Sequence, residues 1–170
     1  MFEHLTTPEE IFSFKLGSAL SMEHDTLAML ADLEQHAQRA ELKTMFREHA
    51  EETRQQIANI EQCFALLGES VDDSPSPVTK GLAKEGTSTI KKTDDSIVDA
   101  VILAGALETE HYEIAVYETL VTNAEARGAT EVATLLRQNL TQEESARDKV
   151  KQAAQRISQE GIAVRTSVAG

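Results

Sequence analysis

The segment Leu107 to Leu120, LETEHYEIAVYETL, combines acidic side chains with the pattern of a buried helix. Glu110, Glu113 and Tyr117 follow a three-four spacing, which places them on one face of a helix. The same face is apolar above and below them, at Leu103, Ala106, Leu120 and Ala124. Two carboxylates in a buried seam indicate either one wall of a metal site or part of a buried polar network.

The other long helical patterns also carry polar groups in the middle of an apolar stripe. Glu23 follows Ala19 and precedes Leu27 and Leu30, and Glu143 lies between Leu140 and Val150. Between residues 40 and 67, the polar residues His49, Glu52 and Gln56 occupy the middle of a stripe that is apolar at both ends. Buried polar groups cost free energy unless they are paired, so these side chains need partners from other helices.

The helices that position these groups can be bounded from the sequence. Thr7-Pro8-Glu9-Glu10 is a helix start, since Thr7 can cap, proline suits the first turn and Glu10 completes a capping box. The pattern then continues to Leu67 without proline, and as one helix would be about 90 Å long, too long for a domain of this size. A turn is therefore expected within the polar stretch 34–41, and the second helix should run from about 40 to 67 and end at Gly68.

Residues 69–93 differ in composition, with Pro75, Pro77 and many Ser, Thr and Gly residues, and predict a long crossover with a short helix over 78–90. A third long helix should start near residues 93–95 and end near 127–128, because acidic capping residues precede it and Gly128 follows it. The fourth should start at 129–131. We expect one domain over 1–160 and a mobile tail over 161–170, where the helical pattern is lost.

Distances from the turns predict that the four acids meet. Glu23 and Glu52 lie about equally far from a turn near residue 37 or 38, and Glu110 and Glu143 about equally far from a turn at 126–128. At 1.5 Å per residue, each pair lies about 22 Å from its turn, roughly half a helix length. In two antiparallel hairpins all four carboxylates therefore converge at mid-bundle.

Four converging carboxylates repel one another unless they take up protons or bind cations. Two divalent metal ions would balance four charges, and carboxylates with an imidazole suit iron or manganese, with zinc able to compete. The alternative is a metal-free buried polar network in which Arg147, one turn beyond Glu143, pairs with the acids.

Composition limits the class of protein and its partners. The 170 residues are rich in helix-forming types, with no Trp and 4% aromatics, which favours an all-α fold. A net charge of −13 opposes binding to nucleic acid or to an anionic membrane. Cys63 is the only cysteine and lies in an apolar helix pattern, and no apolar run reaches the roughly 20 residues of a membrane span. We expect a cytoplasmic protein that binds neither nucleic acid nor membrane.

Three segments resemble the YciE/YciF branch of the ferritin-like superfamily: HAEETRQQI at 49–57, EHYEIAVYETL at 110–120 and LLRQNLTQEE at 135–144. The resemblance covers nearly the whole chain, including KGL at 80–82. It implies a ferritin-like four-helix bundle, two antiparallel hairpins joined by the crossover, commonly dimeric and linked to bacterial stress responses. The metal ligands it implies, together with the positions above, are Glu23, Glu52, Glu110, Glu143, His49 and Glu113.

The sequence also departs from the better-understood di-iron relatives. These carry Glu-x-x-His on the second and fourth helices, whereas here Gln55 follows Glu52 and Ala146 follows Glu143 at that spacing. His49-x-x-Glu52 is the inverted form. Two classes of function remain open: a di-metal site that reacts with peroxide or oxygen, and a non-catalytic stress or scaffold homodimer whose metal is structural or absent.

Overall fold

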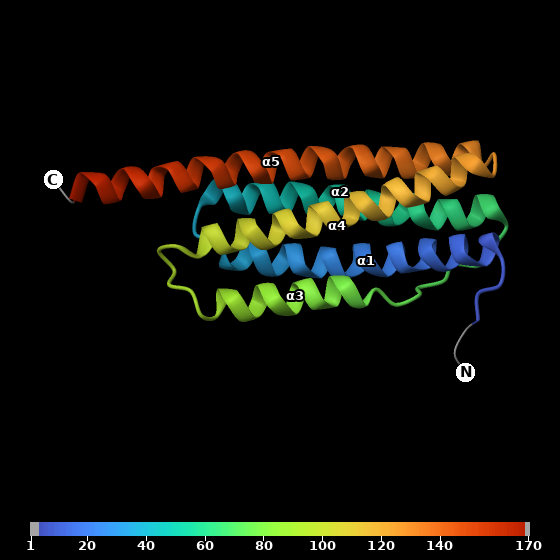
Figure 1. The fold of residues 1–170 in the computed structure, drawn as a ribbon, viewed down its shortest axis with the longest axis horizontal. Coiled ribbons are helices and arrows are strands. Elements are labelled where there is room, and N and C mark those ends of the chain that lie inside the picture. Colours follow the sequence, from blue (N-terminus) through green and yellow to red (C-terminus); the bar gives the residue numbers. More distant parts are fainter. Residues whose placement is uncertain (1–3, 169–170) are drawn as a thin grey trace.

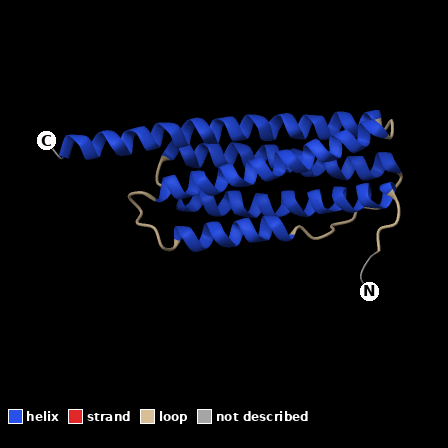
Figure 2. Cartoon of the chain, viewed as in Figure 1, coloured by secondary structure: helices blue, strands red, loops and turns tan. Residues whose placement is uncertain are grey.

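The computed structural model describes residues 4–168, and their side chains as far as residue 160. It contains five helices, α1 (Pro8–His36), α2 (Ala40–Leu67), α3 (Pro77–Ile90), α4 (Val98–Ala126) and α5 (Thr130–Val168). Within 4–168 there is no β-strand (Figure 2), so the predicted all-α class is confirmed. None of the helices over these residues is both long enough and apolar enough to cross a membrane.

The four long helices form a bundle of two hairpins. α1 packs against α2, and α4 packs against α5, while contacts of α2 with α5 and of α1 with α4 join the hairpins. The crossover returns along the bundle and carries α3, which lies outside the four helices against α1 and α4 (Figure 1). This is the predicted architecture of two antiparallel hairpins joined by a long crossover with a short helix.

Local sequence explains most of the helix ends. The Thr7 side chain accepts a hydrogen bond from the Glu10 amide, and the Glu10 carboxylate accepts one from the Thr7 amide, as the capping box predicts. Gly68 ends α2 with a φ of 72°, a left-handed conformation that glycine adopts at little cost. Gly17 lets the crossover pack closely on α1, because a Cβ there would lie 2.9 Å from the carbonyl oxygen of Asp72.

Two predicted boundaries were wrong. α4 begins at Val98 rather than near 93–95, because Asp94 does not cap the helix and instead accepts a hydrogen bond from the Ser96 amide in a local turn. α5 does not lose helical structure near Gly161 but continues to Val168, since one glycine costs a helix only about 1 kcal/mol. Figure 1 shows the end of α5 projecting beyond the other helices. The predicted mobility of 161–168 stays a prediction, and 169–170 lie outside the described residues.

The core is divided into two apolar clusters. One, near the start of α1, includes Phe12, Leu16, Ile60, Phe64, Leu120 and Leu136. The other, near the end of α1, includes Leu30, Phe46, Ile102, Leu103 and Val150. Cys63 is buried in the first cluster, where burial raises the pKa of its thiol to about 12, as expected for a packing residue. The acidic residues predicted to meet at mid-bundle lie between the two clusters.

Candidate metal centre

Four buried side chains from three helices converge between the apolar clusters. His49 comes from α2, Glu110 and Glu113 from α4, and Glu143 from α5. Each contributes one potential ligand atom, and these atoms all lie within 4.8 Å of one another. The structure therefore brings four of the six predicted site residues together, at the depth that the turn distances predicted.

Glu23 of α1 is the fourth buried acid of this layer, with 0% exposure. It lies beside the four-residue group, where the charges of Glu113, His49 and Glu110 act on it. Its Oε1 accepts a hydrogen bond from the Tyr117 hydroxyl. Thus α1 also contributes a carboxylate to mid-bundle, although that carboxylate is turned towards Tyr117.

Each of three carboxylates in the layer accepts one hydrogen bond from a neutral side chain. Besides Tyr117 to Glu23, Thr26 donates to Glu113 Oε1 at 2.5 Å and Gln56 donates to Glu143 Oε1. The second oxygens of Glu23, Glu113 and Glu143 have no partner, nor do Glu110 Oε2 and His49 Nε2. His49 Nε2 is 3.3 Å from Glu110 Oε1, but the two are poorly aligned for a hydrogen bond.

Five unpartnered atoms on potential ligands, with the unpartnered Gln56 Oε1 beside them, gather in one buried layer. This is an unusual concentration, because native proteins leave only a few such atoms per hundred residues. The five are nitrogen and oxygen atoms that face one another inside the layer, as the ligands of a divalent cation do once the cation has displaced their protons. Arg147, the counter-charge of the metal-free alternative, does not reach them, because its guanidinium pairs with Asp148 at 2.9 Å. The donor set of this layer therefore fits metal ions better than it fits a closed polar network.

Burial and mutual repulsion dominate the electrostatics of the layer. Burial raises the pKa of Glu23, Glu113 and Glu143 well above the ordinary value, and the neighbouring carboxylates raise these pKa values further. Burial also opposes a charge on His49, but the adjacent Glu110 and Glu52 carboxylates outweigh it and raise its pKa well above the usual value. Without metal, the layer therefore retains protons that a bound cation would displace.

Glu52, the remaining predicted ligand, is not part of the four-residue group. Its side chain is 30% exposed, and its two oxygens lie 3.2 Å from His49 Nδ1 and 3.5 Å from Lys149 Nζ. The buried stripe of α2 instead passes through His49, Thr53 and Gln56, so Glu52 lies beside the stripe. A carboxylate on Nδ1 orients the ring and leaves Nε2 to face the acids, which is the usual support for a metal-binding histidine.

A cavity of about 10 Å³, roughly the space for one water molecule, connects this edge with the buried layer. Glu52 and Lys149 line it together with His49 and Glu110. Within the layer, the side chains with some solvent exposure are those of His49, at 7%, and Glu110, at 4%. This small gap therefore lies among α2, α4 and α5, beside the Glu52–Lys149 ion pair.

Sequence reasoning missed a chain of amides behind Tyr117. Asn59 of α2 donates to Asn139 Oδ1 at 2.7 Å, and the Asn139 amide donates to the Tyr117 hydroxyl at 3.0 Å. Both asparagines are buried, and the hydrogen bonds run from Asn59 through Asn139 and the Tyr117 hydroxyl to Glu23. The available signal was the position of each asparagine on an apolar stripe, between Gln56 and Ile60 and between Leu136 and Glu143.

Comparisons with known proteins agree with this architecture. The family described as a domain of unknown function, DUF892, matches residues 7–163. Protein YciF of Escherichia coli strain K12 is 33% identical over 144 residues, which span 84% of this chain and 87% of YciF. The crystal structure of this E. coli stress protein superposes with a TM-score of 0.83 at 30% identity, covering 88% of this chain and 96% of that one. YcfI of Rhodopseudomonas palustris, described as a candidate structural protein, gives a TM-score of 0.85 at 31% identity, with 89% and 97% covered.

Proposed function

The chain belongs to the DUF892 family, with the ferritin-like fold of its YciF relatives, and we propose that its mid-bundle layer binds two divalent metal ions, iron or manganese. The observation that carries the proposal is the set of five unpartnered polar atoms on Glu23, His49, Glu110, Glu113 and Glu143. Four carboxylates balance two divalent cations, and one imidazole among oxygens favours iron or manganese, with zinc as a competitor.

The proposed activity is the consumption of peroxide or oxygen during stress. Iron or manganese in such a site supplies Lewis acidity and redox capacity. The chain itself excludes bulk water with the apolar clusters on both sides of the layer. Glu113 and Glu143 hold protons that can be released as charge at the site changes, because burial raises the pKa of both carboxyls.

The Glu52–Lys149 ion pair controls access to the layer in this proposal. It covers the outer end of the narrow cavity, and at 3.5 Å between groups that are 30% and 47% exposed it is weak enough to open readily. Glu52 then has two roles, orienting His49 through Nδ1 and attracting cations to the mouth of the cavity.

A second function is favoured by a separate observation. Hydrogen bonds from Tyr117, Thr26 and Gln56 already occupy one oxygen of each of three acids, and the similar YcfI is described as a candidate structural protein. These support a non-catalytic stress or scaffold protein whose metal is structural or absent. In either case we propose a homodimer in the bacterial cytoplasm, as the single buried cysteine suits a reducing compartment.

Elemental analysis of protein purified without chelator and loaded with Mn²⁺ or Fe²⁺ tests whether the layer binds two metal ions. The wild type should hold close to two ions per chain, and Glu110→Gln should lose most of them. Glu108→Gln is the matched control, because Glu108 is exposed on the same helix. A wild type that resists loading with either ion would exclude the di-metal site.

Peroxide consumption then distinguishes an active centre from a structural one. The loaded wild type should consume peroxide faster than Glu110→Gln, with Glu108→Gln at the wild-type rate. Equal rates in all three proteins would assign the metal a structural role.

A further inference from the structure

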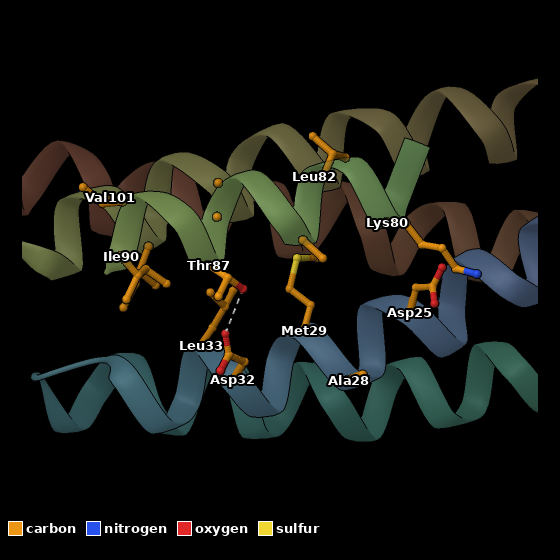
Figure 3. A pocket seen from close by; sticks show the side chains of 14 residues that line it. Asp25, Ala28, Met29, Asp32, Leu33, Lys80, Leu82, Thr87, Ile90 and Val101 are labelled. Atoms are coloured by element: carbon orange, nitrogen blue, oxygen red, sulfur yellow. Dashed lines mark hydrogen bonds between the residues drawn. The ribbon is translucent and has the colours of Figure 1, made fainter. Parts of the chain in front are cut away.

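A second pocket lies outside the metal-centre layer, between the crossover helix α3 and the bundle helices α1 and α4. Its volume is about 300 Å³, at the lower end of the range for small-molecule sites. Figure 3 shows Met29 reaching from α1 towards α3, with Asp25 and Lys80 at one end and Ile90 and Val101 at the other.

Glycines on two of its walls leave this space open. Gly86 of α3 and Gly105 of α4 both line the pocket. Glycine inside a helix is destabilising relative to alanine, and neither position requires it. The left-handed glycines of the described chain are Gly68 and Gly128, and a Cβ at Gly86 or Gly105 would meet no atom within 4 Å. Close packing therefore does not offset the helix stability lost at these two glycines. The structural consequence of their missing side chains is the open pocket.

The lining combines an apolar floor with an excess of negative charge. Met29, Leu33 and Ile102 contribute apolar surface, while two carboxylates, Asp25 and Asp32, face a single ammonium, that of Lys80. Lys80 lies at the Asp25 end (Figure 3). Asp32 lies further along, where Thr87 donates to it at 3.5 Å. Its side chain is 38% exposed, and its Oδ1 also lies 3.3 Å from Nδ1 of His36, which is 40% exposed and does not line the pocket.

We propose that this pocket binds a small amphipathic amine, with its alkyl part on the apolar floor and its ammonium paired with Asp32. Apolar surface provides the affinity, and the carboxylate selects a cationic head group over an anionic one. The site is separate from the metal centre and binds its ligand with or without metal.

Isothermal titration with octylamine and with octanoate tests the proposal on the full chain. Octylamine should bind the wild type saturably, with a dissociation constant of about 0.1–1 mM as expected for a ligand of its size. Octanoate should not bind. Asp32→Asn should weaken octylamine binding by roughly two- to fivefold, because it removes an ion pair at a partly exposed carboxylate.

Two leucine substitutions locate the site. Gly86→Leu should fill the pocket and abolish binding, whereas Gly81→Leu, an exposed position on the same helix with equal space for a Cβ, should bind as the wild type does. Should Gly86→Leu fail to fold, Gly86→Ala should still reduce affinity. The proposal is overturned by absence of saturable octylamine binding, by octanoate binding equally well, or by wild-type affinity in the folded Gly86 variant.

Discussion

Replacing Tyr117 with phenylalanine removes one oxygen from the polar layer and leaves its shape almost unchanged. The hydroxyl donates to Glu23 and accepts from Asn139, and Tyr117 is fully buried. Because Glu23 Oε2 already has no partner, the variant leaves this carboxyl with no hydrogen bond. Leaving a buried polar group without its hydrogen-bond partner costs about 1–3 kcal/mol. Asn139 loses less, about 1 kcal/mol, because its amide also donates to the Gln56 carbonyl at 3.2 Å.

The free energy of unfolding of Tyr117→Phe should therefore fall by about 2–4 kcal/mol, measured by urea denaturation with a chelator present. For a chain of this length the melting temperature should fall by roughly 5–15 °C. Tyr112→Phe is the control, since Tyr112 is half-buried on the same helix but packs on the apolar cluster outside the polar layer. If both variants unfold within about 0.5 kcal/mol of the wild type, the hydrogen bonds assigned to Tyr117 do not stabilise the layer.

Three further predictions concern pH, packing and access. Burial raises the folded-state pKa values of Glu23, Glu113 and Glu143 above the ordinary carboxyl value, so the folded metal-free protein binds protons more tightly than the unfolded chain. Its melting temperature should therefore fall as the pH rises through these raised pKa values, and a melting temperature that rises instead would contradict this sign. Gly17→Ala should cost about 1–3 kcal/mol in unfolding free energy through the 2.9 Å contact with the crossover, whereas Gly81→Ala, with no atom nearby, should stabilise by up to about 1 kcal/mol. Lys149→Gln should speed both metal uptake and chelator-driven metal release by up to about fivefold, which is the contribution of a weak ion pair. Lys151→Gln is the control, because it removes the same charge two residues away. Slower metal release from Lys149→Gln would indicate that the lysine acts only through its charge and not as a gate.

Local signals predicted most of the fold. The Thr7 capping box and Gly68 set the ends of α1 and α2 within a residue, because both act through bonds inside a single turn. The start of α4 could not be read in this way, since Asp94 has several local partners and uses the Ser96 amide. The end of α5 also could not be predicted from the sequence, because Gly161 lowers helix propensity but does not end the helix.

The candidate site was predictable in depth but not in every side-chain direction. Counting from the turns places acids at mid-bundle, since the rise per residue is fixed. Which face of α2 is buried depends on packing against α5, and this packing selects His49 and turns Glu52 to the cavity mouth. The Asn59–Asn139 contact joins residues 80 positions apart. The position of each asparagine on a buried stripe indicates that it needs a partner, but it does not indicate which residue that partner is.

Anomalous diffraction from a crystal of this protein loaded with Mn²⁺ tests the metal centre most directly. We predict two peaks in the mid-bundle layer, with His49 Nε2 and carboxylate oxygens of Glu110, Glu113 and Glu143 at coordination distances of roughly 2.0–2.3 Å. Glu23 should turn its free oxygen towards one of them. Peaks found only among exposed acids, or a loaded crystal with no peak between the two apolar clusters, would contradict the proposed metal centre.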